Sequence, residues 1–415
     1  MHIIVLVAGL IGVSKAHQHL VDGHRVTVVY QAAESAPGTS FANGGLVCPG
    51  HATAWASPHR LRVLLRSIYR RDQPVRLKPR LDPALAAWGL KFLRQCTTAR
   101  AAINTANKSR LCRYSQEVLH QVVDSTGIGF DGNRGGILYL HRTVESLQRA
   151  THDAQRLCDA GQRLDILDRE QVLRIEPALS HGDEPIAGAV YAPSDETGDA
   201  CRFTRALAGW CADQGAEFLF DTRIVRLKRS GDRVDAVETD RGPISGDAYV
   251  LALGVHTPQF ARQVDLKGLP IYPAKGYSMT LPLREPARAP ILGGIDEHSL
   301  LVWARLGDRL RITSKVEIGG FDTGHRPGDF AYMLSLTEAR FPGAADLSAP
   351  NYWAGLRPLT PEGTPRLGPT PISNLYLNAG HGHLGWTMAS GSGRIVADLI
   401  SGQTPAISLD SMLYA

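Results

Sequence analysis

The sequence predicts an α/β protein in which a nucleotide-binding domain is combined with an inserted α+β domain that carries an antiparallel sheet. Residues 2–7 form a continuous apolar run, which is typical of a parallel strand that is buried on both faces. A second run of this kind follows at residues 25–30, and apolar residues recur at helical spacing between the two. This strand–helix–strand unit has the length of a Rossmann-like dinucleotide-binding unit.

The chain of 415 residues is long enough for about two to three structural units, since a single hydrophobic core stops growing below this size. Hydrophobic residues make up 43% and charged residues 20%, which are ordinary values for a folded globular protein. A net charge of +5 is too small for this length to indicate nucleic acid as the main partner. We therefore expect two domains with a cleft between them and a small-molecule ligand.

Short strand-like runs also occur in the middle of the chain and near its C-terminus, at residues 215–220, 224–228, 234–239, 248–253 and 374–378. The segments of about 85–165 and 260–350 contain longer helices, proline-rich loops and strands of antiparallel pattern. We therefore predict a discontinuous nucleotide-binding domain at residues 1–84, 166–259 and 352–415. The substrate domain is predicted at residues 85–165 and 260–351.

The six cysteines are scattered without the spacing of a metal site, and we interpret them as reduced thiols in a cytoplasmic protein. No Lys or Arg precedes the apolar N-terminal run, which favours a buried strand over a secretory signal. No stretch approaches the roughly 20 apolar residues that a spanning helix needs. We expect a soluble or peripherally attached protein.

A glycine-rich turn follows the first strand, where G-x-G-x-x-G is the pattern of a dinucleotide site. The stretch is Val7-Ala8-Gly9-Leu10-Ile11-Gly12, so that valine replaces the first glycine. A β-branched residue at such a tight turn costs about 1–3 kcal/mol. Tyr30 also ends the second strand, where an acidic residue would bind a ribose. Alone, this motif is as compatible with a structural turn as with a nucleotide site.

Longer motifs occur at residues 39–45, 193–199, 272–278, 353–358, 360–365 and 378–388, as TSFANGG, PSDETGD, YPAKGYS, WAGLRP, TPEGTP and NAGHGHLGWTM. With these motifs in this order, the chain resembles the D-amino acid dehydrogenase small-subunit family, within the wider group of D-amino acid oxidase and glycine oxidase-like flavoproteins. The resemblance covers nearly the whole length. It implies an FAD cofactor and a Rossmann-like FAD-binding domain.

The resemblance also implies which residues lie at the cofactor. They are the turn residues 7–12, Tyr30, Ser40, Asn43, Gly44, Gly45, Val225, Gly254, Gly380, His381, Gly382, His383, Leu384, Gly385 and Thr387. A glycine-rich loop without a ligand is the alternative for the segment around residues 40–45. Two histidines at a spacing of two, without nearby cysteines or carboxylates at ligand spacing, do not predict a metal site.

The activity implied by the resemblance is hydride transfer from the α carbon of a D-amino acid to flavin N5, which leaves an imine that hydrolyses to a 2-oxo acid and ammonia. A planar guanidinium holds a carboxylate through two hydrogen bonds, so Arg357 is the first candidate for binding the substrate and Arg305 the second. Tyr277 is a candidate for closing the pocket. A structural ion pair and a packed tyrosine remain the alternatives, and no general base is assigned.

The family resemblance favours a quinone as electron acceptor. In residues 60–71, leucines and an isoleucine share a helical face and arginines, including Arg66, Arg70 and Arg71, flank it; Arg76, Lys78 and Arg80 follow. This pattern suits an anionic membrane surface, and a solvated surface helix is the alternative. Thr313 and Ser314 stand where the family has glycines. Because of these two residues and of Val7 and Tyr30, a degenerate subunit that binds FAD weakly stays open as an alternative. An oxygen-using oxidase is a further alternative.

Overall fold

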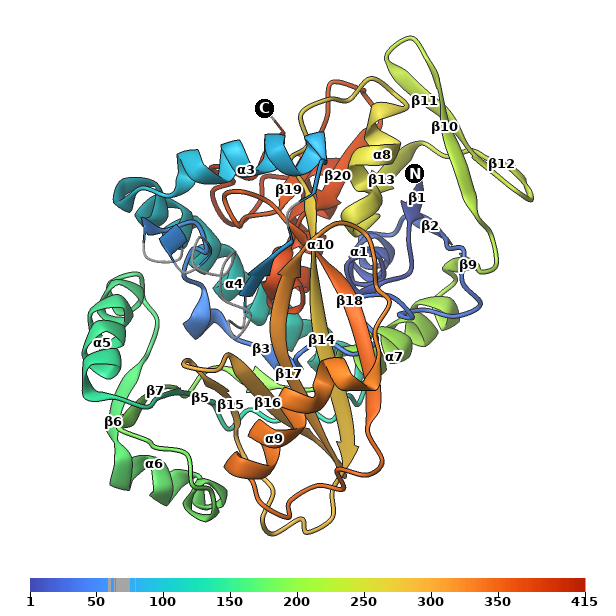
Figure 1. Ribbon diagram of the computed structural model, residues 1–415. Helices are drawn as coiled ribbons and strands as arrows, with labels where there is room; N and C mark the ends of the chain where they lie inside the picture. The colour runs from blue at the N-terminus through green and yellow to red at the C-terminus, as the bar shows by residue number, and fades with distance from the viewer. Residues whose placement is uncertain (59–60, 63, 65–74, 79, 415) are drawn as a thin grey trace.

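The computed structural model describes residues 1–58, 61–62, 64, 75–78 and 80–414 (Figure 1). The first sheet has six strands in the order β19-β20-β13-β1-β2-β9, of which all but β19 are parallel. The strands are β1 His2–Leu6, β2 Arg25–Val29, β9 Glu217–Leu219, β13 Ala248–Leu251, β19 Arg366–Pro369 and β20 Leu375–Ala379. The predicted strand–helix–strand unit is present, with α1 at Leu10–Val21. The first strands lie at the centre of this sheet.

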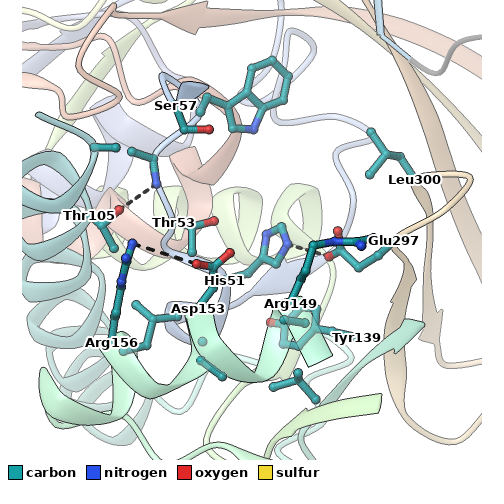
Figure 2. A pocket seen from close by; sticks show the side chains of 18 of the residues that line it. His51, Thr53, Ser57, Thr105, Tyr139, Arg149, Asp153, Arg156, Glu297 and Leu300 are labelled. Carbon is teal, nitrogen blue, oxygen red and sulfur yellow. Dashed lines mark hydrogen bonds and ion pairs between the residues drawn. The ribbon is translucent and has the colours of Figure 1, made fainter. Parts of the chain in front are cut away.

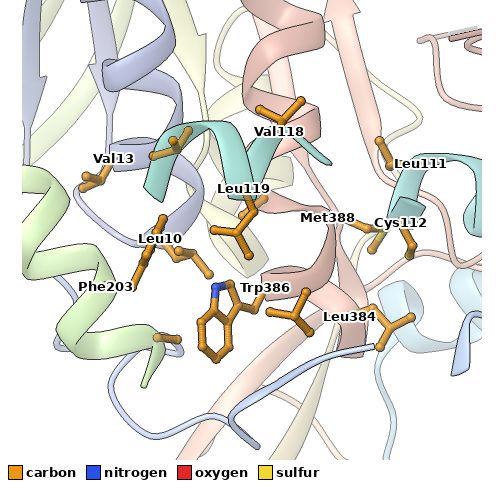
Figure 3. Packing of buried hydrophobic residues seen from close by; sticks show 14 of the residues in the cluster. Leu10, Val13, Leu111, Cys112, Val118, Leu119, Phe203, Leu384, Trp386 and Met388 are labelled. Atoms are coloured by element: carbon orange, nitrogen blue, oxygen red, sulfur yellow. The ribbon is translucent and has the colours of Figure 1, made fainter. Parts of the chain in front are cut away.

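Helices cover one face of the six-stranded sheet and a small antiparallel sheet packs on the other. Apolar side chains of α1, α4 (Thr98–Thr126), α7 (Ala200–Asp213) and α10 (Gly385–Ile400) form one core, and Figure 3 shows part of it around Leu119 and Trp386. The strands β10 (Ile224–Ser230), β11 (Arg233–Thr239) and β12 (Gly242–Ile244) pair with one another, and β10 and β11 pack against β1 and β13. This part of the molecule is the expected α/β domain, and the structure shows that it has three layers.

Helix α10 lies between α1 and α4 because glycines allow close contact of the backbones. A Cβ on Gly391 would lie 2.6 Å from the Cα of Ser115 in α4. A Cβ on Gly393 would lie 3.2 Å from the carbonyl oxygen of Ser14 in α1. These contacts hold the N-terminus of α10 at the ends of the central strands.

The second sheet has nine strands and forms the floor of the other domain. Its order is β18-β14-β17-β16-β15-β5-β7-β6, with β4 added at β17. The strands are β4 Val75–Leu77, β5 Ile137–His141, β6 Asp165–Asp168, β7 Gly188–Ala192, β14 Tyr272–Pro282, β15 Gly293–Asp296, β16 Leu301–Leu306, β17 Arg309–Ile318 and β18 Asn351–Leu359. Most pairs are antiparallel, as expected for this domain.

The remaining elements surround the two sheets. They are β3 Leu46–Val47, paired with β8 Glu196–Thr197, and the helices α3 Pro83–Gln95, α5 Val144–Asp159, α6 Arg169–Ile175, α8 Thr257–Arg262 and α9 Ala331–Arg340. Apolar residues of α6 and α9 pack with the nine-stranded sheet. In the part of the chain that the structure describes, no helix combines the length and the apolar character needed to cross a membrane.

The division of the chain differs from the predicted one at several places. Strands β7 and β18 were expected in the nucleotide-binding domain, but both belong to the nine-stranded sheet. Strand β18 pairs with β14 from Asn351 to Leu359, so its backbone hydrogen bonds are made in that sheet. Helix α4 was expected in the substrate domain, but its buried residues share the core of α1 and α10. The apolar pattern of these segments would be the same in either domain, because the pattern shows that a side of the segment is buried but not which element buries it.

Helix α1 carries an unusual number of buried polar residues on its inner side. The ammonium of Lys15 and both ring nitrogens of His19 have no hydrogen-bond partner among the residues described. Burial lowers the pKa of Lys15 and of His19 well below their usual values. Burial, with a smaller contribution from Arg394, lowers the pKa of His17 to about 4. The fold therefore favours the neutral form of His17 and His19.

Candidate active site

A cavity of about 810 Å³ lies between the two sheets, at the carboxyl ends of β1 and β2. This is where open parallel sheets bind their ligands. The predicted site residues that line it are Val7, Gly9, Leu10, Ile11, Tyr30, Ser40, Asn43, Gly44, Gly45, Gly254, Tyr277, Arg357, His381, Gly382, His383, Leu384 and Gly385. Thr313 and Ser314 line it as well. Segments from both ends and the middle of the chain therefore meet in one cavity.

The glycine turn forms one end of this cavity and is strained at Val7. The backbone φ of Val7 is 116°, in the region that favours glycine. Gly12 cannot be replaced without movement, because a Cβ there would lie 1.9 Å from the carbonyl oxygen of Val7. The amide of Leu10, at the N-terminus of α1, donates to Oγ of Ser40 at 3.0 Å. The loop of residues 38–45 thus closes over the start of the helix, where an anion is stabilised.

The N-terminus of α10 forms the opposite wall. The buried ring of His381 is 2.9 Å from Oγ of Ser392, and burial, followed by the charge of Lys15, lowers its pKa to about 3. His383 instead lies against Trp55, with ring centroids 5.1 Å apart, and its Nε2 is 3.3 Å from the ammonium of Lys108. The two histidines therefore have different surroundings. Within the described ranges, no group of three or more His, Cys, Asp or Glu side chains could hold a metal ion.

Arg357 brings a positive charge into the cavity from β18. A Cβ on Gly276, in the neighbouring strand β14, would lie 2.7–3.0 Å from the guanidinium, so glycine leaves room for it. Burial lowers the pKa of Arg357 to about 10. No carboxylate or carbonyl of the described residues accepts a hydrogen bond from this guanidinium or forms an ion pair with it, and it lines the cavity. A buried cation without a protein partner is a binding group for an anionic ligand.

Arg305 is not part of this cavity, so the second candidate for binding the carboxylate was wrong. Its guanidinium donates to the carbonyl oxygens of Gly307 and Pro286, each at 3.3 Å. Alternate residues of a strand point to opposite faces, and in β16 Val302 lines the cavity. Arg305 stands an odd number of residues from Val302, and its side chain therefore points to the other face.

Other predicted residues support the cavity without lining it. Ala8, Gly12, Gly380 and Thr387 lie within the segments that form the walls, and Oγ1 of Thr387 accepts a hydrogen bond from the amide of Cys48 at 3.1 Å. Val225 is 43% exposed, and its neighbours Arg223 and Ile224 line the cavity in its place. Tyr277 does line it, and burial raises the pKa of its hydroxyl. Tyr277 is therefore neutral over the physiological range.

The sequence did not predict the residues that lie between this cavity and a second, larger one. The second cavity is about 1560 Å³, and it shares His51, Trp55, Leu300 and Lys315 with the first (Figure 2). His51 follows the glycine-rich loop by six residues, and its titratable side chain is the one signal that could have indicated it.

The predicted membrane-binding role of the basic segment is not tested by the structure, because Arg66, Arg70 and Arg71 lie outside the described residues. Lys78 pairs with Glu317 at 2.7 Å.

Comparison with known proteins identifies the group to which this architecture belongs. The family model described as FAD dependent oxidoreductase matches residues 2–399. The chain belongs to this family of FAD-dependent oxidoreductases. "D-amino acid dehydrogenase 2" of Mesorhizobium japonicum is 43% identical over 415 residues, 100% of both chains. The D-amino acid dehydrogenase of Paramagnetospirillum magneticum is 42% identical over 413 residues, 99% of this chain and 98% of the relative.

Solved structures agree on the fold. Glycine oxidase from Bacillus cereus is similar with a TM-score of 0.76 and 22% identity, covering 100% of this chain and 98% of the other. L-proline dehydrogenase from P. horikoshii has a TM-score of 0.73 and 18% identity, covering 97% of this chain and 94% of the other. The predicted α/β fold and the predicted family are both confirmed.

The cavity fits the FAD cofactor of the family. The glycine turn, the start of α1 and the loop of residues 38–45 form a cradle for the diphosphate, and a Cβ on Gly9 would lie 3.6 Å from Oγ of Ser40. The N-terminus of α10 would face the ring system, where its dipole stabilises negative charge. Tyr30 and Gln31 line the place where an acidic residue usually binds the ribose. The polar contact at the ribose therefore differs from the usual one.

Replacing Val7 by glycine should stabilise the protein and tighten FAD binding. Glycine adopts a φ of 116° without strain, and relief of about 1–3 kcal/mol exceeds the roughly 0.5–1 kcal/mol of added chain entropy. We expect a higher melting temperature and a lower dissociation constant for FAD, measured by thermal unfolding and by fluorescence titration. Ala8→Gly is the matched control and should lower stability, because Ala8 has no positive φ. If Val7→Gly had the same melting temperature and the same dissociation constant for FAD as the wild type, the turn would not be strained.

Proposed function

We propose that the chain oxidises D-amino acids to 2-oxo acids and ammonia and passes the electrons to a quinone-type acceptor. The observation that carries the proposal is the buried guanidinium of Arg357, which faces the cavity and has no partner among the described residues. The relatives named above act, by their names, on D-amino acids as dehydrogenases. An amino acid supplies the carboxylate that such a guanidinium holds by two hydrogen bonds.

Fixing the carboxylate decides which hydrogen of the α carbon faces the cofactor. When bound, FAD accepts the hydride from that carbon. The protein's contribution is orientation: Arg357 holds one end of the substrate, and Tyr277 also lines the cavity, from β14. Because its hydroxyl stays neutral, Tyr277 can donate a hydrogen bond to the carboxylate without repelling it.

The acceptor and the location follow from the same proposal. A basic, amphipathic segment at residues 60–71 suits the anionic cytoplasmic face of a membrane, where a quinone is available. The larger cavity gives the acceptor a second route to the flavin site, since four residues border both cavities: His51, Trp55, Leu300 and Lys315. We place the protein in the cytoplasm, peripherally attached to the inner membrane.

The proposal is tested by following the flavin through one turnover. A D-amino acid should reduce the bound flavin under anaerobic conditions, and a soluble quinone analogue should then reoxidise it faster than dissolved oxygen does. Hydrogen peroxide formed in proportion to the substrate consumed would identify an oxidase instead. The panel of D-amino acids that reduces the flavin would define the substrate range.

A further inference from the structure

His51 stands at the boundary of the two cavities. It ends the short 3-10 helix Pro49–His51 that follows β3, and it lines both the flavin-site cavity and the larger cavity. Figure 2 shows its ring between Glu297, in the segment after β15, and Thr53. The side chains of His51 and Glu297 are 20% and 17% exposed, so water in the cavities can reach both.

The contact with Glu297 determines where His51 can accept a proton. Nε2 of His51 lies 2.8 Å from Oε1 of Glu297. An ionised carboxylate only accepts hydrogen bonds, so Nε2 must carry the hydrogen and Nδ1 keeps its lone pair. None of the described residues donates a hydrogen bond to Nδ1. The imidazole is thus oriented as a base by a carboxylate, as in other histidine–carboxylate pairs.

The ring is held in place from its other side. It stacks on Tyr139 of β5, with centroids 4.9 Å apart and an angle of 16° between the rings. The Tyr139 hydroxyl donates to Asp195 at 2.5 Å, and Asp195 accepts the amide of Gly50 at 2.9 Å. This arrangement links the ring to the backbone next to it. Among the described residues, the titratable groups around His51 include Glu297, Tyr139, His141, Asp195, Arg149 and Lys315.

The other bases at the flavin-site cavity are less suited to accept a proton. Burial holds His381 in the neutral form, since its pKa is about 3. The ammonium of Lys108 lies 3.3 Å from Nε2 of His383 and opposes a further positive charge there. Lys315 donates to the carbonyl oxygen of Asp329 at 2.7 Å. His256 lines the flavin-site cavity together with Gly254 and Ile224, and its ring stacks on Phe321. His51 alone combines a carboxylate partner with access to both cavities in the described part of the chain.

We propose that His51 removes a proton from the ammonium group of the bound amino acid, with Glu297 as the positioning residue. The inference rests on the amino acid oxidation proposed above. The N–H bond breaks, its electron pair stays on nitrogen, and Nδ1 of His51 takes the proton. The neutral amine then has the lone pair that forms the C=N bond as the α hydrogen leaves as hydride. The proton passes to water through the larger cavity.

His51→Gln tests the proposal through the pH dependence of kcat/KM. The wild type should keep a kcat/KM that changes little with pH around neutrality, because the dyad deprotonates the bound ammonium. His51→Gln must take the rare neutral amine from solution. Its kcat/KM should be lower by roughly 100-fold or more at pH 7 and rise about tenfold per pH unit until it approaches the wild type. Bound FAD should be unchanged.

Glu297→Gln provides the second variant and His120→Gln the matched control. Glu297→Gln should shift the profile in the same direction by a smaller factor, since the amide can donate to Nε2 and move the hydrogen to Nδ1. His120 and Glu196 form a similar pair, 2.9 Å apart, away from both cavities, and His120→Gln should keep the wild-type profile.

Parallel profiles of the wild type and both dyad variants would overturn the proposal, even where the variants are uniformly slower. If His51→Gln does not fold, the profile of Glu297→Gln decides. The proposed function would fail in a different way, because a wild-type flavin that no D-amino acid reduces at any pH contradicts amino acid oxidation itself.

Discussion

Arg357→Lys should lower kcat/KM for the D-amino acid by roughly 100-fold while the content of bound FAD stays the same. Lysine keeps the charge but cannot form two parallel hydrogen bonds with a carboxylate. A hydrogen bond to a charged group contributes about 1.5–3 kcal/mol. Loss of one such bond, together with misplacement of the substrate, therefore accounts for the roughly 100-fold decrease in kcat/KM. Steady-state kinetics with an artificial electron acceptor and the visible flavin spectrum provide the two measurements.

Arg305→Lys is the matched control for this experiment. Arg305 is also an arginine in the nine-stranded sheet, but it donates to the carbonyl oxygens of Gly307 and Pro286 outside the cavity. Its replacement should leave kcat/KM nearly unchanged. If Arg357→Lys lost its flavin but kept normal substrate kinetics in the remaining holoenzyme, Arg357 would belong to the cofactor site.

Acid should destabilise the fold strongly between about pH 6.5 and pH 4. The pKa values of the buried His17, His19 and His381 are lowered, so the folded state favours the neutral rings. The unfolded chain binds protons at its usual histidine pKa of about 6.5, and stability that is complete above this pH is lost as the pH falls. By pH 5, His17 and His381 each contribute a loss of about 2 kcal/mol, and His19 acts in the same direction. Melting temperatures at constant ionic strength, measured from pH 8 to pH 5, test this.

His19→Leu should flatten the pH dependence, because the ring nitrogens of His19 have no partner in the described structure and leucine removes a titrating group. His152→Gln is the control, since the His152 side chain is 72% exposed. If His19→Leu and the wild type lost equal stability between pH 8 and pH 5, His19 would not be held neutral by the fold.

The parts of the fold that the sequence predicted are those determined by local patterns. The β1–α1–β2 unit follows from an apolar run, a glycine turn and helical spacing, all within residues 2–30. The strain at Val7 follows from the same turn, because the position requires a positive φ whatever the rest of the fold is. Arg357 lines the cavity as expected from the motif around it.

The parts that the sequence did not predict depend on contacts between distant segments. Strand β18 pairs with β14, some 80 residues earlier, and nothing within its own nine residues indicates which sheet it joins. His51 and Glu297 are 246 residues apart, so their contact exists only in the folded chain. Arg305 was misplaced because the face of β16 that meets the cavity depends on the registration of the whole sheet.

Anaerobic titration of the FAD-loaded protein with the two enantiomers of one amino acid tests the central claim most directly. We expect the D enantiomer to bleach the visible flavin absorbance and the L enantiomer to leave it unchanged, because Arg357 fixes the carboxylate in one orientation. Bleaching by the L enantiomer at an equal rate would contradict this orientation. A protein that takes up no FAD, or whose flavin no D-amino acid bleaches, would contradict the account as a whole.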